Sequence, residues 1–309
     1  PPTSAPPSSL SPQAASDHAT VTHAETPSRR LKLTAGKSTP ESAIPHTLSR
    51  PMPKPALFLA LVAAACARSP SFDEPLVDRS NGQLPEVVAP RIGDAEIVID
   101  GTLDEGAWSR AATTGMFVSP SSGKPAPKSR VNARARVAWS DTRLFVGLVV
   151  WDAAAATPFA RDDVDPHIWS KASGVEVMLQ PGDRGDNRDY FEIQLDVAGA
   201  VWDTRFDDYN RPVTGGPDDA TRRFGHQEWR SEVERAVRRG AGRYQVELAI
   251  PFRALTTAGT PTPPRAGDVW RLNLYSFRDG QGDALAWSPL LGQGNFHRSG
   301  RFGRMRFGP

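Results

Sequence analysis

Two aromatic residues stand in polar, turn-rich segments of the sequence rather than in apolar strands. Trp169 lies within DVDPHIWSKASG, and Phe296 lies within LLGQGNFHRSG. A ring on a loop can stack on the apolar CH face of a sugar, while nearby charged and amide groups bond the sugar hydroxyls. A loop aromatic can also simply pack against the core. We take the two rings as candidates for stacking on a ring-shaped ligand.

Two carboxylates, Glu176 and Glu192, fall on the polar faces of predicted strands. A pair of carboxylates can act as acid and base in glycoside hydrolysis, but solvated strand carboxylates are more common. The sequence has no GxSxG, P-loop, HExxH or dinucleotide-binding motif. We therefore expect a binding protein, and we keep a glycoside hydrolase as the less favoured alternative.

Two turns are rich in aspartate, which suggests a metal site. RDDVD contains Asp162, Asp163 and Asp165, and GDRGDNRD contains Asp183, Asp186 and Asp189. Calcium prefers several oxygen ligands on a flexible loop. Aspartate also favours turns for its own hydrogen bonds, and the EF-hand spacing is absent. We expect no required cofactor, with Asp183, Asp186 and Asp189 as the candidate structural calcium site.

The segments that must position these residues alternate apolar and polar side chains from residue 91 onward. Such short alternations, separated by Gly, Asp and Asn turns, predict antiparallel strands. We expect strands at 95–99, 131–139, 144–152, 175–180, 190–197, 201–206, 229–238, 244–250, 270–277 and 303–307. One helix is expected at 102–111, with Thr102 as its cap and Glu105 three residues later. About ten strands predict an all-β, antiparallel, jelly-roll-like β-sandwich over residues 91–309.

The stretch MPKPALFLALVAAAC, residues 52–66, has the parts of a signal peptide. Its apolar run is too short for a transmembrane helix, which needs ~20 residues. Cys66 is the only cysteine and ends the run as a lipobox does, so we expect lipidation there; ordinary cleavage nearby is the alternative. Residues 1–51 are expected to be a disordered leader or upstream sequence that is not translated, and residues 67–90 a tether.

The charge balance argues against a nucleic-acid partner. The chain has 37 Lys and Arg against 35 Asp and Glu, but residues 1–66 hold six of the basic and three of the acidic groups. The rest has 31 basic and 32 acidic groups, so it lacks the basic excess of a nucleic-acid binder. We expect an outer-membrane or cell-surface lipoprotein that contacts the membrane only through its lipid. A secreted or periplasmic protein is the alternative.

Five segments, in order, resemble the family 9 carbohydrate-binding modules. They are IVIDGTLDEGAW (97–108), VAWSDTRLFVGLVVWD (137–152), IWSKASGVEVML (168–179), YQVELAIPFRAL (244–255) and LAWSP with NFHRSGRFGRMRF (285–289 and 295–307). The resemblance implies a β-sandwich that binds a polysaccharide or oligosaccharide without catalysis, in the context of polysaccharide breakdown. An envelope module of the same fold that binds a protein or another partner is the alternative.

The resemblance also implies a set of binding residues. Trp169 and Phe296 would hold a chain-end sugar between them, and Glu176 would bond a hydroxyl. Glu192, Tyr275 and Gln293 stand where the family has Arg, Gln and Asn. Exchanging Arg for Glu removes a fork of hydrogen-bond donors, so the sugar preference is expected to differ from the family's.

Overall fold

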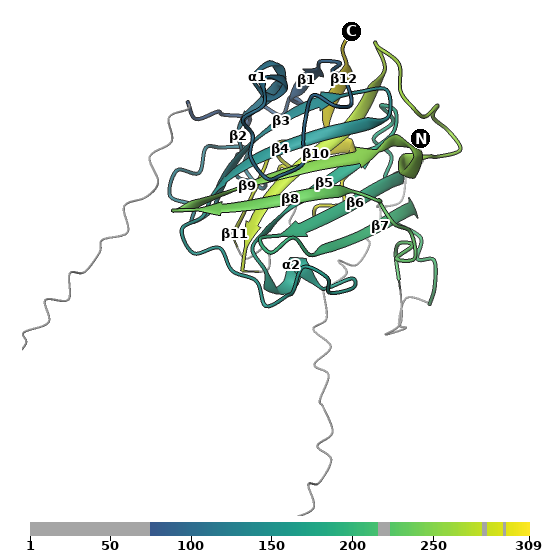
Figure 1. Ribbon diagram of the computed structural model, residues 1–309. Coiled ribbons are helices and arrows are strands. Elements are labelled where there is room, and N and C mark those ends of the chain that lie inside the picture. The colour runs from purple at the N-terminus through teal and green to yellow at the C-terminus, as the bar shows by residue number, and fades with distance from the viewer. Residues whose placement is uncertain (1–74, 216–222, 280–282, 293–294) are drawn as a thin grey trace, which may run out of the picture. The chain divides into compact units, whose positions relative to one another are not determined.

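Two β-sheets, seen in Figure 1, form the fold in the computed structural model, which describes residues 75–215, 223–279, 283–292 and 295–309. Sheet A has the order β1-β12-β10-β5-β6-β7, with β11 also paired to β10, and sheet B has the order β2-β3-β4-β9-β8. The strands of sheet A are β1 (Glu86–Ala89), β5 (Gly174–Gln180), β6 (Arg188–Asp196), β7 (Val201–Asp208), β10 (Val269–Arg278), β11 (Asp283–Ala286) and β12 (Gly303–Phe307). The strands of sheet B are β2 (Ala112–Met116), β3 (Asn132–Trp139), β4 (Arg143–Trp151), β8 (Glu234–Gly240) and β9 (Arg243–Pro251).

The main core lies between the two sheets, which confirms the predicted β-sandwich. On β5 the inward side chains are Val175, Val177 and Leu179, which share one buried cluster with Val146 and Leu148 of β4. Because side chains alternate along a strand, the same pattern that buries these residues turns the even-numbered residues of β5 to the outer face. Each buried aliphatic side chain contributes about 1.5–3 kcal/mol.

Strand β1 corrects the predicted boundary of the tether at residues 67–90. Glu86–Ala89 pairs in parallel with β12, from Glu86 opposite Arg304 to Ala89 opposite Phe307. Val87 and Ala89 are buried in the main core. The sandwich therefore begins before residue 91. The sequence did not indicate this strand, because an alternation over four residues is too short to stand out.

The region around the predicted helix also differs from expectation. Helix α1 spans only Gly106–Arg110, and its cap residue makes no side-chain cap bond. The Glu105 carboxylate accepts the Val98 N–H at 2.9 Å, and the Thr102 hydroxyl accepts Arg238. Both side chains of the expected capping box thus have other partners, and residues 95–99 form no strand.

Smaller differences concern short elements that the sequence pattern did not predict. Strands β2 and β11, the four-residue helix α2 (Ile168–Lys171) and the 3₁₀ turns at Phe252–Leu255 and Ser299–Arg301 are of this kind. Strand β8 begins at residue 234 instead of 229.

The predictions for residues 1–51, the 52–66 segment and Cys66 concern residues outside the described part of the chain, so they stay predictions. Within the described residues, no helix has both the length and the apolar character needed to cross a membrane.

Candidate saccharide site on the outer face of sheet A

A row of four side chains crosses the outer face of sheet A. The strand register places Tyr275 of β10 opposite Glu176 of β5, Glu176 opposite Gln194 of β6, and Gln194 opposite Trp202 of β7. All four side chains are buried. Two aromatic residues therefore stand at the ends of the row, with a carboxylate and an amide between them.

Gln194 joins the two predicted carboxylates. Its Nε2 donates to Glu176 Oε2 at 3.1 Å and to Glu192 Oε1 at 2.7 Å. Gln194 was not among the predicted site residues, although it lies two residues after Glu192 on the same polar strand face. That spacing was the signal in the sequence that could have identified it.

Glu192 faces the half-buried imidazole of His297. Its Oε2 lies 3.7 Å from His297 Nε2, and His297 Nδ1 is hydrogen-bonded to the Tyr190 hydroxyl at 2.7 Å. Burial raises the pKa of Glu192 to about 8 and lowers the pKa of His297 to about 3. Desolvation disfavours the charged form of each group, so at neutral pH both are uncharged and the contact is not an ion pair.

The two predicted aromatic residues lie over opposite ends of the row. Phe296 stacks on Tyr275, with ring centroids 4.1 Å apart and planes 3° apart. Trp169, on helix α2, meets Trp202 edge to face with centroids 4.7 Å apart. Tyr275 and Trp202 are three strands apart, which is about 14 Å at ~4.8 Å per strand. Trp169 and Phe296 are half-buried rather than exposed as expected, because each packs on a ring of the row.

Several buried polar atoms of the site have no hydrogen-bond partner among the described residues. They are Gln194 Oε1, Glu192 Oε2 and Thr204 Oγ1, and Thr204 lies opposite Glu192 in the register. Buried polar atoms are normally bonded. These three can accept hydrogen bonds, and the hydroxyl of Thr204 and the neutral carboxyl of Glu192 can also donate.

Of the remaining predicted residues, Tyr275 belongs to the row and Gln293 lies outside the described residues. The Tyr275 hydroxyl accepts Asn273 Nδ2 at 2.7 Å and donates to the Phe296 carbonyl at 3.3 Å. Tyr275 thus fixes the backbone of the loop that carries Phe296, in addition to stacking on its ring.

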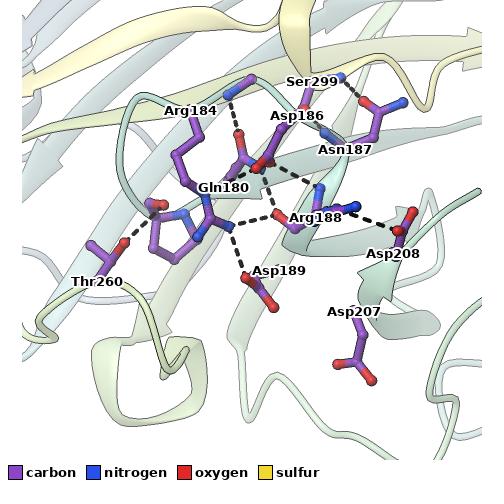
Figure 2. Close-up of polar contacts among 12 residues, drawn as sticks. Gln180, Arg184, Asp186, Asn187, Arg188, Asp189, Asp207, Asp208, Thr260 and Ser299 are labelled. Carbon is purple, nitrogen blue, oxygen red and sulfur yellow. Dashed lines mark hydrogen bonds and ion pairs between the residues drawn. The ribbon is translucent and has the colours of Figure 1, made fainter.

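The aspartates of GDRGDNRD are taken up by local hydrogen bonds and ion pairs, and the calcium site stays a prediction. Figure 2 shows Arg184 reaching Asp189, and Asp186 bonded to the Gln180 amide at 2.8 Å. Asp183 forms ion pairs with Arg271 and Arg304. These carboxylates are directed at donors instead of a common centre, and the described residues contain no group of three or more His, Cys, Asp or Glu able to hold a metal ion.

The other aspartate turn is likewise used for local bonds. Asp165 pairs with Arg230 at 2.8 Å, and Asp163 accepts the Ala160 N–H at 3.0 Å. Asp162 is exposed.

An amide side chain joins the two glutamates. A glycosidase keeps the space between its two carboxyl groups for the scissile bond or a water molecule. Here the Gln194 amide bridges the two groups, and both are buried. The site offers groups for hydrogen bonding and for stacking.

This fold and this site define a β-sandwich binding module. A family model described as "Carbohydrate family 9 binding domain-like" matches residues 99–306, and the chain belongs to that family.

Two solved structures are similar to this chain at low sequence identity. A putative carbohydrate-binding protein from Bacteroides uniformis is 19% identical, with 73% of this chain and 100% of that chain covered and a TM-score of 0.52. A family 9 carbohydrate binding module from Caldicellulosiruptor kristjanssonii, in complex with cellotriose, is 15% identical, with 72% and 93% covered and a TM-score of 0.49. A comparison with curated proteins found no match.

Proposed function

We propose that this protein binds an oligosaccharide on the outer face of sheet A and has no catalytic role there. The observation that carries the proposal is the buried row Tyr275–Glu176–Gln194–Trp202, with Phe296 and Trp169 packed over its ends. Membership of the carbohydrate family 9 binding domain-like family supports the same ligand class.

In this proposal the sugar lies between the two loop rings, above the polar centre of the row. The rings of Trp169 and Phe296 contact its apolar CH faces, and Glu176, Glu192 and Gln194 bond its hydroxyls. Because so few contacts must offset the loss of ligand freedom, the affinity is weak.

The two carboxyl groups also define which sugars fit. The buried site disfavours a negatively charged sugar, because the anion would lose its hydration there and neutral His297 offers no compensating charge. A neutral carboxyl at Glu192 offers one donor and one acceptor, which suits a hydroxyl. The proposed ligand is therefore an uncharged oligosaccharide.

A glycan array followed by calorimetric titration tests the proposal. We expect binding of an uncharged oligosaccharide, weakened at least tenfold in Trp169→Ala and in Phe296→Ala because each loses a stacking partner. Trp229→Ala is the matched control. Trp229 is also half-buried, but it packs on Phe191 in the core between the sheets, so its loss should lower stability and leave the affinity unchanged.

Two outcomes would contradict the proposal. One is a folded chain that binds no uncharged glycan on the array. The other is a titration in which Trp169→Ala and Phe296→Ala bind as tightly as the unchanged chain. Release of reducing sugar from a bound glycan, abolished by Glu176→Gln, would instead indicate a hydrolase.

A further inference from the structure

The outer face of sheet B carries a second group of polar side chains, on the sheet opposite to the one that bears the row. We call it the arginine surface and define it as Arg134, Arg136, Arg238 and Arg243, together with Trp151 and Gln245. It lines two adjoining hollows of about 570 Å³ and 330 Å³, which share Arg243 and Gln245. Nothing in the proposed function uses these residues.

The strand register brings the arginine surface together. In Figure 1, β3, β4, β9 and β8 lie side by side. One row runs Arg134, Val149, Gln245, Arg238, and the next row places Trp151 opposite Arg243. The ends of the first row are three strands apart, about 14 Å at ~4.8 Å per strand. Arg243 follows a two-residue turn, Ala241-Gly242, in which Gly242 has φ +72°.

Three arginines of this surface, Arg136, Arg238 and Arg243, have no carboxylate partner among the described residues. Arg136 donates to the Trp108 carbonyl and Arg238 to the Thr102 hydroxyl. Within the described part of the chain, Arg136, Arg238 and Arg243 form no ion pair. Other exposed arginines are paired, such as Arg253 with Glu232.

Two acidic residues line the smaller hollow, Asp104 and Glu105. The Glu105 carboxylate accepts the Val98 N–H, and neither residue forms an ion pair with Arg136, Arg238 or Arg243 within the described residues. These three guanidinium groups therefore outnumber the two carboxylates beside them.

Like charges act on one another inside the surface. The pKa of Arg134 is lowered by burial and then by the charges of Arg136 and Arg243. Arg134 also lies over the Trp151 ring, with 5.9 Å from Cζ to the ring centroid. A bound anion would relieve the repulsion between the guanidinium groups.

We propose that the arginine surface binds an acidic saccharide, one that carries carboxylate or sulfate groups. Guanidinium groups hold such groups with forked, charge-assisted hydrogen bonds. Trp151 has a ring suited to the CH face of a sugar, and Gln245, whose Oε1 accepts the Leu103 N–H at 3.1 Å, can donate from its Nε2 to a hydroxyl. A nucleic acid fits less well, because residues 67–309 have 31 basic and 32 acidic groups, and nucleic-acid binders carry a wide basic surface.

The test measures the affinity of the full chain for charged and uncharged forms of the same glycan. The probes are oligogalacturonate and its methyl ester, dextran sulfate and dextran, and a single-stranded DNA oligonucleotide. We expect binding of oligogalacturonate or dextran sulfate that weakens with added salt, and no binding of the uncharged partner at this surface. Which of the two binds more tightly identifies carboxylate or sulfate as the preferred group.

The variants separate this surface from general attraction by positive charge. The double variant Arg238→Gln/Arg243→Gln should weaken binding of the acidic probe about tenfold, as expected for the loss of one or two charge-assisted hydrogen bonds. The control Arg253→Gln/Arg265→Gln removes the same charge from exposed arginines elsewhere and should change the affinity less than twofold.

Three results would overturn the proposal. The first is an equal loss of affinity for the acidic probe in the two double variants. The second is that each acidic glycan binds no more tightly than its uncharged partner, both for oligogalacturonate against its methyl ester and for dextran sulfate against dextran. The third is tighter binding of DNA than of either acidic glycan. Each is distinguishable from failure of the site on sheet A, because that site is tested with uncharged oligosaccharides and with Trp169→Ala.

Discussion

At the scale of single residues, burial decides the protonation state of the groups on the outer face of sheet A. Glu192 and His297 lie 3.7 Å apart, but the pKa of the carboxyl is about 8 and that of the imidazole about 3. Glu192 also keeps one hydrogen bond, from Gln194, that favours its charged form. Desolvation outweighs this bond, so Glu192 and His297 are uncharged at neutral pH.

The pH dependence of stability should report the burial of Glu192. The pKa of this carboxyl rises from an ordinary value of 4.5 to about 8, so between these values the folded state binds more protons than the unfolded state. Its contribution to the free energy of unfolding is therefore present below about pH 4.5 and is lost as the pH rises to 8. His297 acts with the opposite sign, because its contribution grows between about pH 3 and 6.5.

The variant Glu192→Gln removes the titrating group and keeps an acceptor for Gln194. Urea denaturation at pH 6.5, 7.25 and 8, above the window of His297, should show the variant gaining on the unchanged chain as the pH rises. The gain at pH 8 is expected to be on the order of 2 kcal/mol. Glu234→Gln, at an exposed position of β8, is the control. An identical pH slope in Glu192→Gln and the unchanged chain would show that Glu192 ionises normally when folded.

At the scale of elements, the segment that leads into α1 covers part of the outer face of sheet B. Glu247 of β9 accepts the N–H groups of Asp100 and Gly101 and the Trp108 Nε1–H, at 2.9, 2.6 and 2.8 Å. The arginine surface adjoins this cover, because Arg136 donates to the Trp108 carbonyl and Arg238 to the Thr102 hydroxyl. Gly147 of β4 permits this cover, because a side chain at that position would collide with Leu103 and Trp108.

The variant Gly147→Ala tests how tightly the segment around α1 packs on β4. An added Cβ would meet Leu103 Cδ2 at 2.5 Å and the Trp108 ring at 3.0 Å. Overpacking of this kind costs about 1–3 kcal/mol, and the free energy of unfolding should fall by that amount in chemical denaturation. Gly240→Ala, where the nearest atom is 3.7 Å away, should change it much less. Equal effects of the two substitutions on the free energy of unfolding would mean that the segment around α1 can move away from β4 at little cost.

At the scale of the whole molecule, the first and the last strand of the sandwich pair with each other in sheet A. Strand β1, near residue 86, pairs with β12, near residue 305, and the Gly308 N–H donates to the Ala89 carbonyl at 2.7 Å. This parallel pair closes the fold between parts of the chain more than two hundred residues apart. No local sequence pattern indicates which residues pair here, so only the tertiary structure shows it.

Shortening the chain should therefore reduce stability in a position-dependent way. A chain that begins at residue 91 loses β1 and the burial of Val87 and Ala89, while a chain that begins at residue 75 keeps them. We expect the shorter chain to have a free energy of unfolding lower by about 3 kcal/mol, measured by urea denaturation. If the two chains unfold at the same urea concentration, residues 75–90 act as a tether and β1 adds nothing.

The amino-acid sequence by itself determined most of the strands and the outward direction of the two glutamates of the site. Alternation in 174–180 and 188–196 is strong because one face is core and the other is not, so β5, β6 and the outward direction of Glu176 and Glu192 follow from it. Trp169 and Phe296 could be recognised because aromatic residues are rare in polar loops.

Only the tertiary structure decided which side chains meet. Strand register between distant segments brings Tyr275, Gln194 and Trp202 into line with Glu176, and it gathers Arg134, Arg238 and Arg243 on the opposite sheet. The aspartates of GDRGDNRD looked available to a metal, but arginines from β10, β12 and the turn itself take them. Local sequence sets the direction of a side chain, whereas its partners depend on contacts between distant residues that no short pattern encodes.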